Sequence, residues 1–82
     1  MDFIDEVIEH LKEYAVSING SDPASLSPET RFEEDLGCKS IQYVQFTSKL
    51  EDEYEVEVPF MAFKRCRTFR DAAEYIQKLL YG

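Results

Sequence analysis

The first part of the chain repeats apolar residues with the period of an α-helix. They recur at steps of three and four positions from Phe3 to Ala15, which places them on one face of a helix. The first turn is acidic, as suits the positive end of a helix dipole. Asn19 and Gly20 follow the last periodic positions and predict the end of this helix.

A stretch rich in serine, proline and aspartate follows, from position 17 to about position 39. Pro23 and Pro28 argue against a regular helix through it. Long connections of this kind are uncommon in compact domains and often serve a function. The residues that we expect to anchor this loop in the core are Leu26, Phe32 and Leu36.

A second helix is predicted to begin at Ser40. Serine is a favourable N-cap, and Gly37 lets the backbone turn just before it. An acidic run at positions 51–53 lies near the end of this helix. The buried face is predicted to comprise Ile41, Val44, Leu50 and Tyr54, with Phe46 as a further candidate.

The last third of the chain predicts two more helices. Val56–Pro59 is expected to be a short extended connection, too short to predict a strand. A short helix is expected over Phe60–Arg65, and Thr68, with Asp71 three positions on, is expected to cap the last helix. The pattern predicts an all-α fold, a small four-helix bundle with three longer helices, a short third helix and a long first loop. We expect residues 1–82 to form one domain.

Charge and composition narrow the possible functions. The formal net charge of the chain is −8, so it repels phosphate backbones and we expect no nucleic-acid partner. An acidic surface favours basic patches on protein partners. No apolar run approaches the length of a membrane span. We expect a cytoplasmic monomer whose two cysteines, Cys38 and Cys66, are free.

The side chains give little sign of an independent active site. His10 is the only histidine, and it falls on the polar side of the first helix, where we expect it to be solvated. Ser40 has no base near it in sequence, whereas serine hydrolysis needs one. The carboxylates lie in runs such as Glu33–Asp35 and lack the spacing of a calcium loop. We therefore expect neither catalytic residues nor a metal site.

Several segments together resemble the acyl carrier protein family. That family carries a Glu-Asp-Leu-Gly run followed by Asp-Ser-Leu at the head of its second helix. This chain has the same run at Glu34–Gly37 and then Lys39-Ser40-Ile41. The likeness continues through Leu50–Tyr54, Val56–Pro59 and Thr68–Ala72. It covers nearly the whole chain, with the order and spacing of the helices intact.

This resemblance implies a function for particular positions. Ser40 matches the serine that bears 4'-phosphopantetheine through a phosphodiester, and the thiol of that arm holds acyl groups as thioesters. The implied partners are a phosphopantetheinyl transferase and the loading, acyl-transfer or synthase enzymes of fatty-acid, lipid or related biosynthesis, with basic docking patches. The residues predicted to contact partners are Glu34, Asp35, Lys39, Ile41, Glu51, Glu53, Phe60 and Met61.

The chain departs from the family pattern at three places. Lys39 stands where the family usually has aspartate, which reverses the charge presented to the transferase. Thr47 and Ser48 are polar where the family tends to be apolar, which changes the expected acyl pocket. The segment from Phe60 to Arg70 holds four of the nine basic residues together with exposed apolar candidates. These departures indicate a specialised carrier with dedicated partners.

Three other interpretations stay open on the sequence. An aminoacyl or polyketide carrier shares the arm and the fold. A non-carrier acidic interaction module would use Ser40 only as a cap, and Lys39 favours it. A small hydrolase would use Ser40 as nucleophile, and the lack of a nearby base argues against it.

Overall fold

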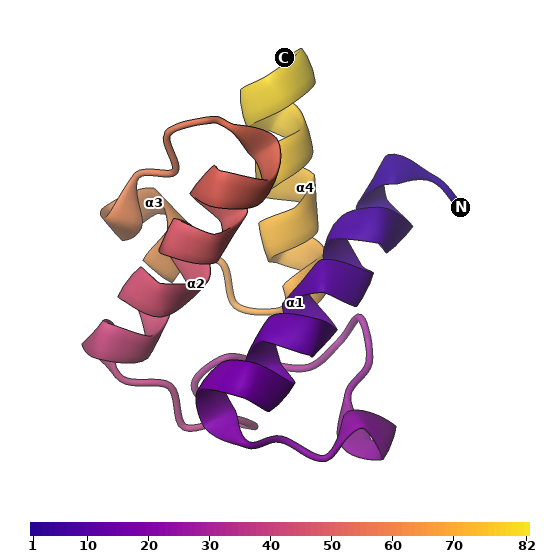
Figure 1. The fold of residues 1–82 in the computed structure, drawn as a ribbon, viewed down its shortest axis with the longest axis vertical. Helices are drawn as coiled ribbons and strands as arrows, with labels where there is room; N and C mark the ends of the chain where they lie inside the picture. The colour runs from indigo at the N-terminus through magenta and orange to yellow at the C-terminus, as the bar shows by residue number, and fades with distance from the viewer.

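Four α-helices and one 3-10 turn follow one another in the computed structural model, which describes residues 1–82. Their bounds are α1 Phe3–Asn19, η1 Pro23–Ser25, α2 Ser40–Tyr54, α3 Phe60–Lys64 and α4 Phe69–Tyr81. Figure 1 shows α1, α2 and α4 as the long helices, with the short α3 beside α2. The predicted all-α bundle, with a short third helix and a long first loop, is confirmed. No helix has the length and apolar character that crossing a membrane requires.

Local signals set the end of α1 and the start of α4 as predicted. Gly20 ends α1 in the left-handed conformation with φ 67°, which glycine adopts without steric cost. At α4, Thr68 Oγ1 accepts a hydrogen bond from the Asp71 amide at 3.1 Å. Asp71 Oδ2 accepts one from the Thr68 amide at 3.2 Å, which completes the capping box.

The long loop between α1 and α2 is tied to the segment that leads into α4. The Phe32 amide donates to the Arg67 carbonyl at 3.0 Å, and the Phe69 amide donates to the Thr30 carbonyl at 3.0 Å. Leu26 and Phe32 are buried, and Leu36 is half-buried against the core. The three predicted anchors are therefore confirmed, and they hold the loop that delivers the chain to Ser40.

An aromatic cluster fills the space between the helices. The Phe32 ring lies 5.3 Å from Phe46, 5.4 Å from Phe63, 5.1 Å from Phe69 and 5.7 Å from Tyr43, centroid to centroid. Inclined rings at such distances attract one another beyond the area that they bury. Phe32 comes from the loop, so the loop supplies the central residue of the core.

The predicted buried face of α2 is partly wrong. Ile41 is 66% exposed and Val44 is 44% exposed. Leu50 and Phe46 are buried and Tyr54 is half-buried, as expected. The buried positions are Tyr43, Phe46, Thr47 and Leu50. Two apolar stripes overlap on this helix, and the stripe with the aromatic rings faces Phe32 because it buries more apolar area.

The connection from α2 to α3 contains no strand. The Val58 amide donates to Glu51 Oε2 at 2.8 Å, and the Val58 side chain is buried. This hydrogen bond anchors the start of α3 beside the C-terminal half of α2.

Candidate functional site

Ser40 is the first helical residue of α2, and Lys39 is the N-cap. The predicted N-cap at Ser40 is therefore wrong by one residue. The side chain of Gln42 takes over the capping function, because its Oε1 accepts from the Lys39 amide at 3.1 Å. The Ser40 hydroxyl is exposed and makes no hydrogen bond within the protein. It is therefore available for covalent modification.

The backbone around Ser40 suits a phosphodiester. The amides of Gln42 and Tyr43 donate to the Lys39 carbonyl at 2.9 and 3.1 Å, whereas those of Ser40 and Ile41 have no acceptor in the protein. Unpaired amides and the positive end of a helix dipole favour an anion at this position. The group that the sequence implies thus fits the donors present.

Two neighbours set the direction in which the chain enters α2. Gly37 adopts φ 63°, and nothing lies within 4 Å of the position that a Cβ would occupy. The Gln42 amide Nε2 donates to Asn19 Oδ1 at 3.1 Å, which links the head of α2 to the end of α1. Ser40 is therefore placed by a turn and by a contact between helices.

Comparison with known proteins identifies the family. The family model described as "Phosphopantetheine attachment site" matches residues 9–76. The chain belongs to this family, the phosphopantetheine-dependent acyl carrier proteins. Its prosthetic group is covalently attached 4'-phosphopantetheine.

Curated relatives and a solved structure agree with the family. The meromycolate extension acyl carrier protein of Mycolicibacterium smegmatis is 35% identical over 92% of this chain and 76% of its own length. The protein of the same name from Mycobacterium tuberculosis is 33% identical over 92% of this chain and 65% of its own. A free-standing peptidyl carrier protein from Acinetobacter baumannii superposes with a TM-score of 0.82 at 19% identity, covering 94% and 95% of the two chains. That likeness shows the shared fold.

The predicted docking acids just before α2 are paired within the carrier protein. Arg67 Nε donates to Glu34 Oε2 at 2.8 Å, and Arg31 Nη2 donates to Asp35 Oδ1 at 3.0 Å. The hydrogen bond from each guanidinium lowers the pKa of the carboxyl that it contacts. The negative charge in front of Ser40 is therefore largely balanced.

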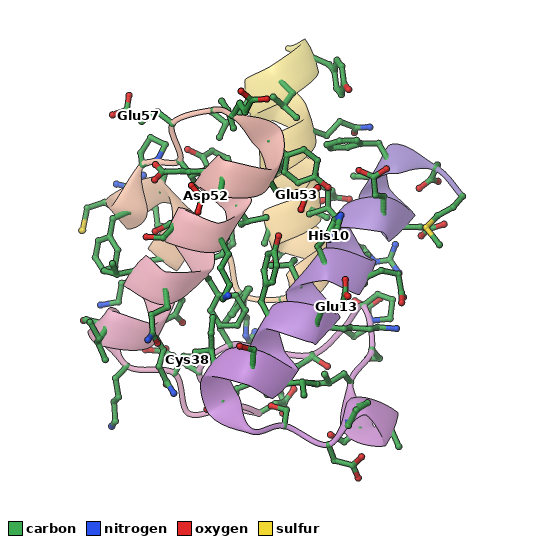
Figure 2. The ribbon with its side chains drawn as sticks, viewed as in Figure 1. His10, Glu13, Cys38, Asp52, Glu53 and Glu57 are labelled. Carbon is green, nitrogen blue, oxygen red and sulfur yellow. The ribbon has the colours of Figure 1, made fainter.

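The predicted acids on α2 are also engaged. Glu51 is half-buried and accepts the Val58 hydrogen bond, and Glu53 Oε2 lies 3.7 Å from His10 Nε2. The exposed acids without an ion pair at this end are Asp52, Glu55 and Glu57, which the predicted docking set omitted. Figure 2 shows Asp52, Glu53 and Glu57 toward the end of α2 that lies away from Cys38. The sequence held a signal for Asp52, because successive residues of a helix face different directions and Asp52 therefore points away from Glu51 and Glu53.

The prediction that His10 is solvated is wrong. Its side chain is only 25% exposed, and Nδ1 lies 3.5 Å from Glu13 Oε1. The ring stacks on Tyr14 and meets the edge of Tyr54. Figure 2 shows it between Glu13 on α1 and Glu53 on α2. His10 therefore joins these two helices, a contact that the polar face of one helix does not reveal.

The apolar members of the predicted docking set behave differently from one another. Ile41 and Met61 project into solvent, and Met61 is 63% exposed. Phe60 is half-buried and packs against the core. Thr47, which was expected to alter an acyl pocket, is buried, and its hydroxyl donates to the Val44 carbonyl at 2.9 Å. The exposed apolar surface of α2 and α3 therefore includes Ile41, Val44 and Met61.

Both cysteines are free, as predicted, and their thiols are protected. Cys38 is buried and Cys66 is half-buried. Burial raises the pKa of each thiol to about 11. Thiolate is the nucleophilic form, so neither cysteine is activated at neutral pH.

An open groove lies beside the first turn of α2. It has a volume of about 240 Å³, and it is lined by Glu33, Glu34, Tyr43, Lys64, Arg65, Cys66 and Arg67. No group of three or more histidine, cysteine, aspartate or glutamate residues is placed to hold a metal ion.

Proposed function

We propose that Ser40 bears the 4'-phosphopantetheine arm through a phosphodiester. The observation that carries this proposal is the exposed Ser40 hydroxyl, free of hydrogen bonds, at the first residue of α2. The neighbouring amides without acceptors would face the phosphate and favour its negative charge. Residues 1–82 would form one carrier unit that acts as a monomer.

The thiol at the end of the arm would hold acyl intermediates as thioesters. Because Cys38 and Cys66 have raised pKa values, the arm would supply the reactive thiol of the carrier. The reactive chemistry then belongs to the arm and to the partner enzymes, and the protein positions and presents the cargo. Free, protected thiols also favour a reducing compartment such as the cytoplasm.

We propose that the cargo consists of acyl intermediates of lipid biosynthesis. The relatives that support this proposal are named for meromycolate extension, and they share about a third of their residues with this chain over nine-tenths of its length. The peptidyl carrier protein shares the fold at 19% identity, so it gives no support for an aminoacyl cargo.

The partners would be a phosphopantetheinyl transferase and enzymes that load, transfer or extend the acyl chain. The exposed side chains of α2 and α3 would form their docking surface, which would include Lys39 and Ile41 beside Ser40 and Met61 on α3. Glu34, Asp35, Glu51 and Glu53 would position the docking elements through their internal contacts.

Intact-mass spectrometry of the protein purified from its native host tests Ser40. We expect a phosphopantetheinyl adduct on the wild-type chain and on Ser48→Ala, a matched control because Ser48 is an exposed serine on the same helix. We expect no adduct on Ser40→Ala. An adduct that persists in Ser40→Ala, or a wholly unmodified wild-type population, would contradict the proposal and favour an interaction module.

A further inference from the structure

Three cations near the head of α2 have no partner within the protein. Lys39, Lys64 and Arg65 are exposed and take part in no ion pair. By contrast, each of the other arginines is held by a carboxylate. Their pairs are Arg31 with Asp35, Arg67 with Glu34, and Arg70 with Glu29.

The fold brings the basic end of α3 to the first turn of α2. The hydrogen bond from the Val58 amide to Glu51 anchors the chain beside the C-terminal half of α2 just before α3 begins. At the other end of α3, Lys64 and Arg65 line the same groove as Tyr43, three residues after Ser40. Since α3 lies beside α2 (Figure 1), its two cations flank the end of α2 that carries Ser40.

The two ends of α2 therefore differ in charge. The groove beside the first turn of α2 is lined by the cations Lys64, Arg65 and Arg67 and by the carboxylates Glu33 and Glu34. With the N-cap Lys39, four cations stand against two carboxylates, an excess of two positive charges. At the other end, the exposed acids Asp52, Glu55 and Glu57 have no ion pair. Figure 2 shows Glu57 and Asp52 toward that end and Cys38 near the head.

Exposed apolar side chains accompany these charges on α2 and α3. Ile41 and Val44 project from α2, and Met61 projects from α3. An apolar centre with a charged rim is the composition of a protein–protein docking surface. The sign of the rim determines which partners are attracted and which are repelled.

We propose that the enzyme that installs the arm surrounds its active-site entrance with carboxylates that contact Lys39, Lys64 and Arg65. This inference rests on the proposed function, because it assumes that Ser40 is modified. An apolar contact to Ile41, Val44 and Met61 completes the interface. A transferase with a basic entrance meets net repulsion at the head of α2 and modifies this carrier poorly.

Coenzyme A, in which a pyrophosphate joins the pantetheine arm to the nucleotide, supplies both the group that is transferred to Ser40 and the leaving group. The Ser40 oxygen forms a bond to the phosphorus that bears pantetheine, and the bond from that phosphorus to the bridging oxygen breaks. Adenosine 3',5'-bisphosphate leaves, and the hydroxyl proton passes to a base of the transferase or to water. The chain contributes the nucleophilic oxygen and the docking charges, and the transferase contributes the catalytic groups.

Charge reversal tests the docking contact. The transferases of the native host are assayed with coenzyme A on wild type, Lys39→Glu, Lys64→Glu, Arg65→Glu and the triple variant. The matched control is Lys78→Glu, which reverses an exposed cation without an ion pair on α4. We expect KM for the carrier to rise about tenfold in the triple variant at low salt, with kcat little changed, because exposed charges act mainly on association. The rise should shrink at high salt, and Lys78→Glu should behave as wild type.

The outcomes separate this inference from the proposed function. If the wild-type chain is not modified by any host transferase, the proposed function fails. If the wild-type chain is modified and the triple variant has an unchanged or lower KM, Ser40 remains the attachment residue and the acidic-entrance inference is overturned. Circular dichroism melting of each variant is the control for folding, and we expect the exposed substitutions to leave the fold intact. A transferase with a basic entrance should gain activity on Lys39→Asp.

Discussion

The sequence suggests that Glu34 is a free surface acid, but in the structure its carboxylate is paired. Glu34 belongs to an acidic run, yet Arg67, which lies 33 positions later in the chain, donates to it. This hydrogen bond lowers the pKa of Glu34. The resulting ion pair ties the loop before α2 to the segment before α4, and it removes negative charge from the head of α2.

Arg67→Ala should raise the pKa of Glu34 toward the ordinary range of a glutamate, because the carboxylate loses the hydrogen bond that favours its charged form. The contact favours the charged carboxylate, so its contribution to stability is present at neutral pH and is lost as pH falls through the lowered pKa of Glu34. The contribution is small because both groups are exposed. A titration of side-chain carboxyl carbons by NMR measures the pKa directly. Lys78→Ala is the control, and an unchanged Glu34 pKa in Arg67→Ala would refute the assignment.

At the scale of elements, the start of α2 depends on a contact with α1. Gln42 accepts from the Lys39 amide and donates to Asn19 on α1. The Gln42 side chain thus caps α2 and also holds the start of α2 against α1. The N-cap residue itself is a lysine, whose side chain has no acceptor for the free amides.

Gln42→Ala should lower the free energy of unfolding by about 1 kcal/mol, the usual cost of losing a cap or one hydrogen bond. It should also speed hydrogen exchange at the Lys39 amide, which loses its acceptor. Urea unfolding and hydrogen exchange followed by NMR measure the two effects. Gln45→Ala is the matched control, because Gln45 is exposed on the same helix and makes no side-chain hydrogen bond. Equal effects in the two variants would show that the contact contributes nothing.

For the whole molecule, the aromatic cluster joins the long loop to three helices. Phe32 contributes the ring that meets Tyr43 and Phe46 on α2, Phe63 on α3 and Phe69 on α4. These side chains are all buried. The position of Ser40 thus depends on the core, because the same loop carries Phe32 inward and then leads to the head of α2.

Phe32→Ala should lower the free energy of unfolding by about 3–5 kcal/mol through lost burial and the cavity left behind. This is a large share of the roughly 5–15 kcal/mol that stabilises a typical domain. If that variant does not fold, Phe32→Leu should fold with a smaller loss, which urea unfolding measures. Met61→Ala is the control at an exposed apolar position, expected within about 0.5 kcal/mol of wild type. If Phe32→Ala lowers the free energy of unfolding no more than Met61→Ala does, Phe32 does not stabilise the core as proposed.

The amino-acid pattern alone was enough to predict the helices, the long first loop and the start of α2 at Ser40, with the N-cap misplaced by one residue. These features follow from short-range causes. The Thr68 capping box and the left-handed Gly20 involve neighbours within a few positions. The family resemblance also points to Ser40 through local motifs, because the spacing of the helices is preserved along the chain.

Which stripe of α2 is buried, and which charges remain without an ion pair, follows from contacts between segments that are far apart in the chain. Ile41 and Val44 are exposed although they are more apolar than the buried Tyr43 and Thr47, so periodicity alone does not choose between the two stripes. The choice depends on Phe32, which reaches α2 from a separate loop. In the same way, Arg67 neutralises Glu34 across 33 positions, whereas Lys39 and Arg65 remain unpaired. Such contacts depend on distances in space, and a pattern along the chain carries no record of them.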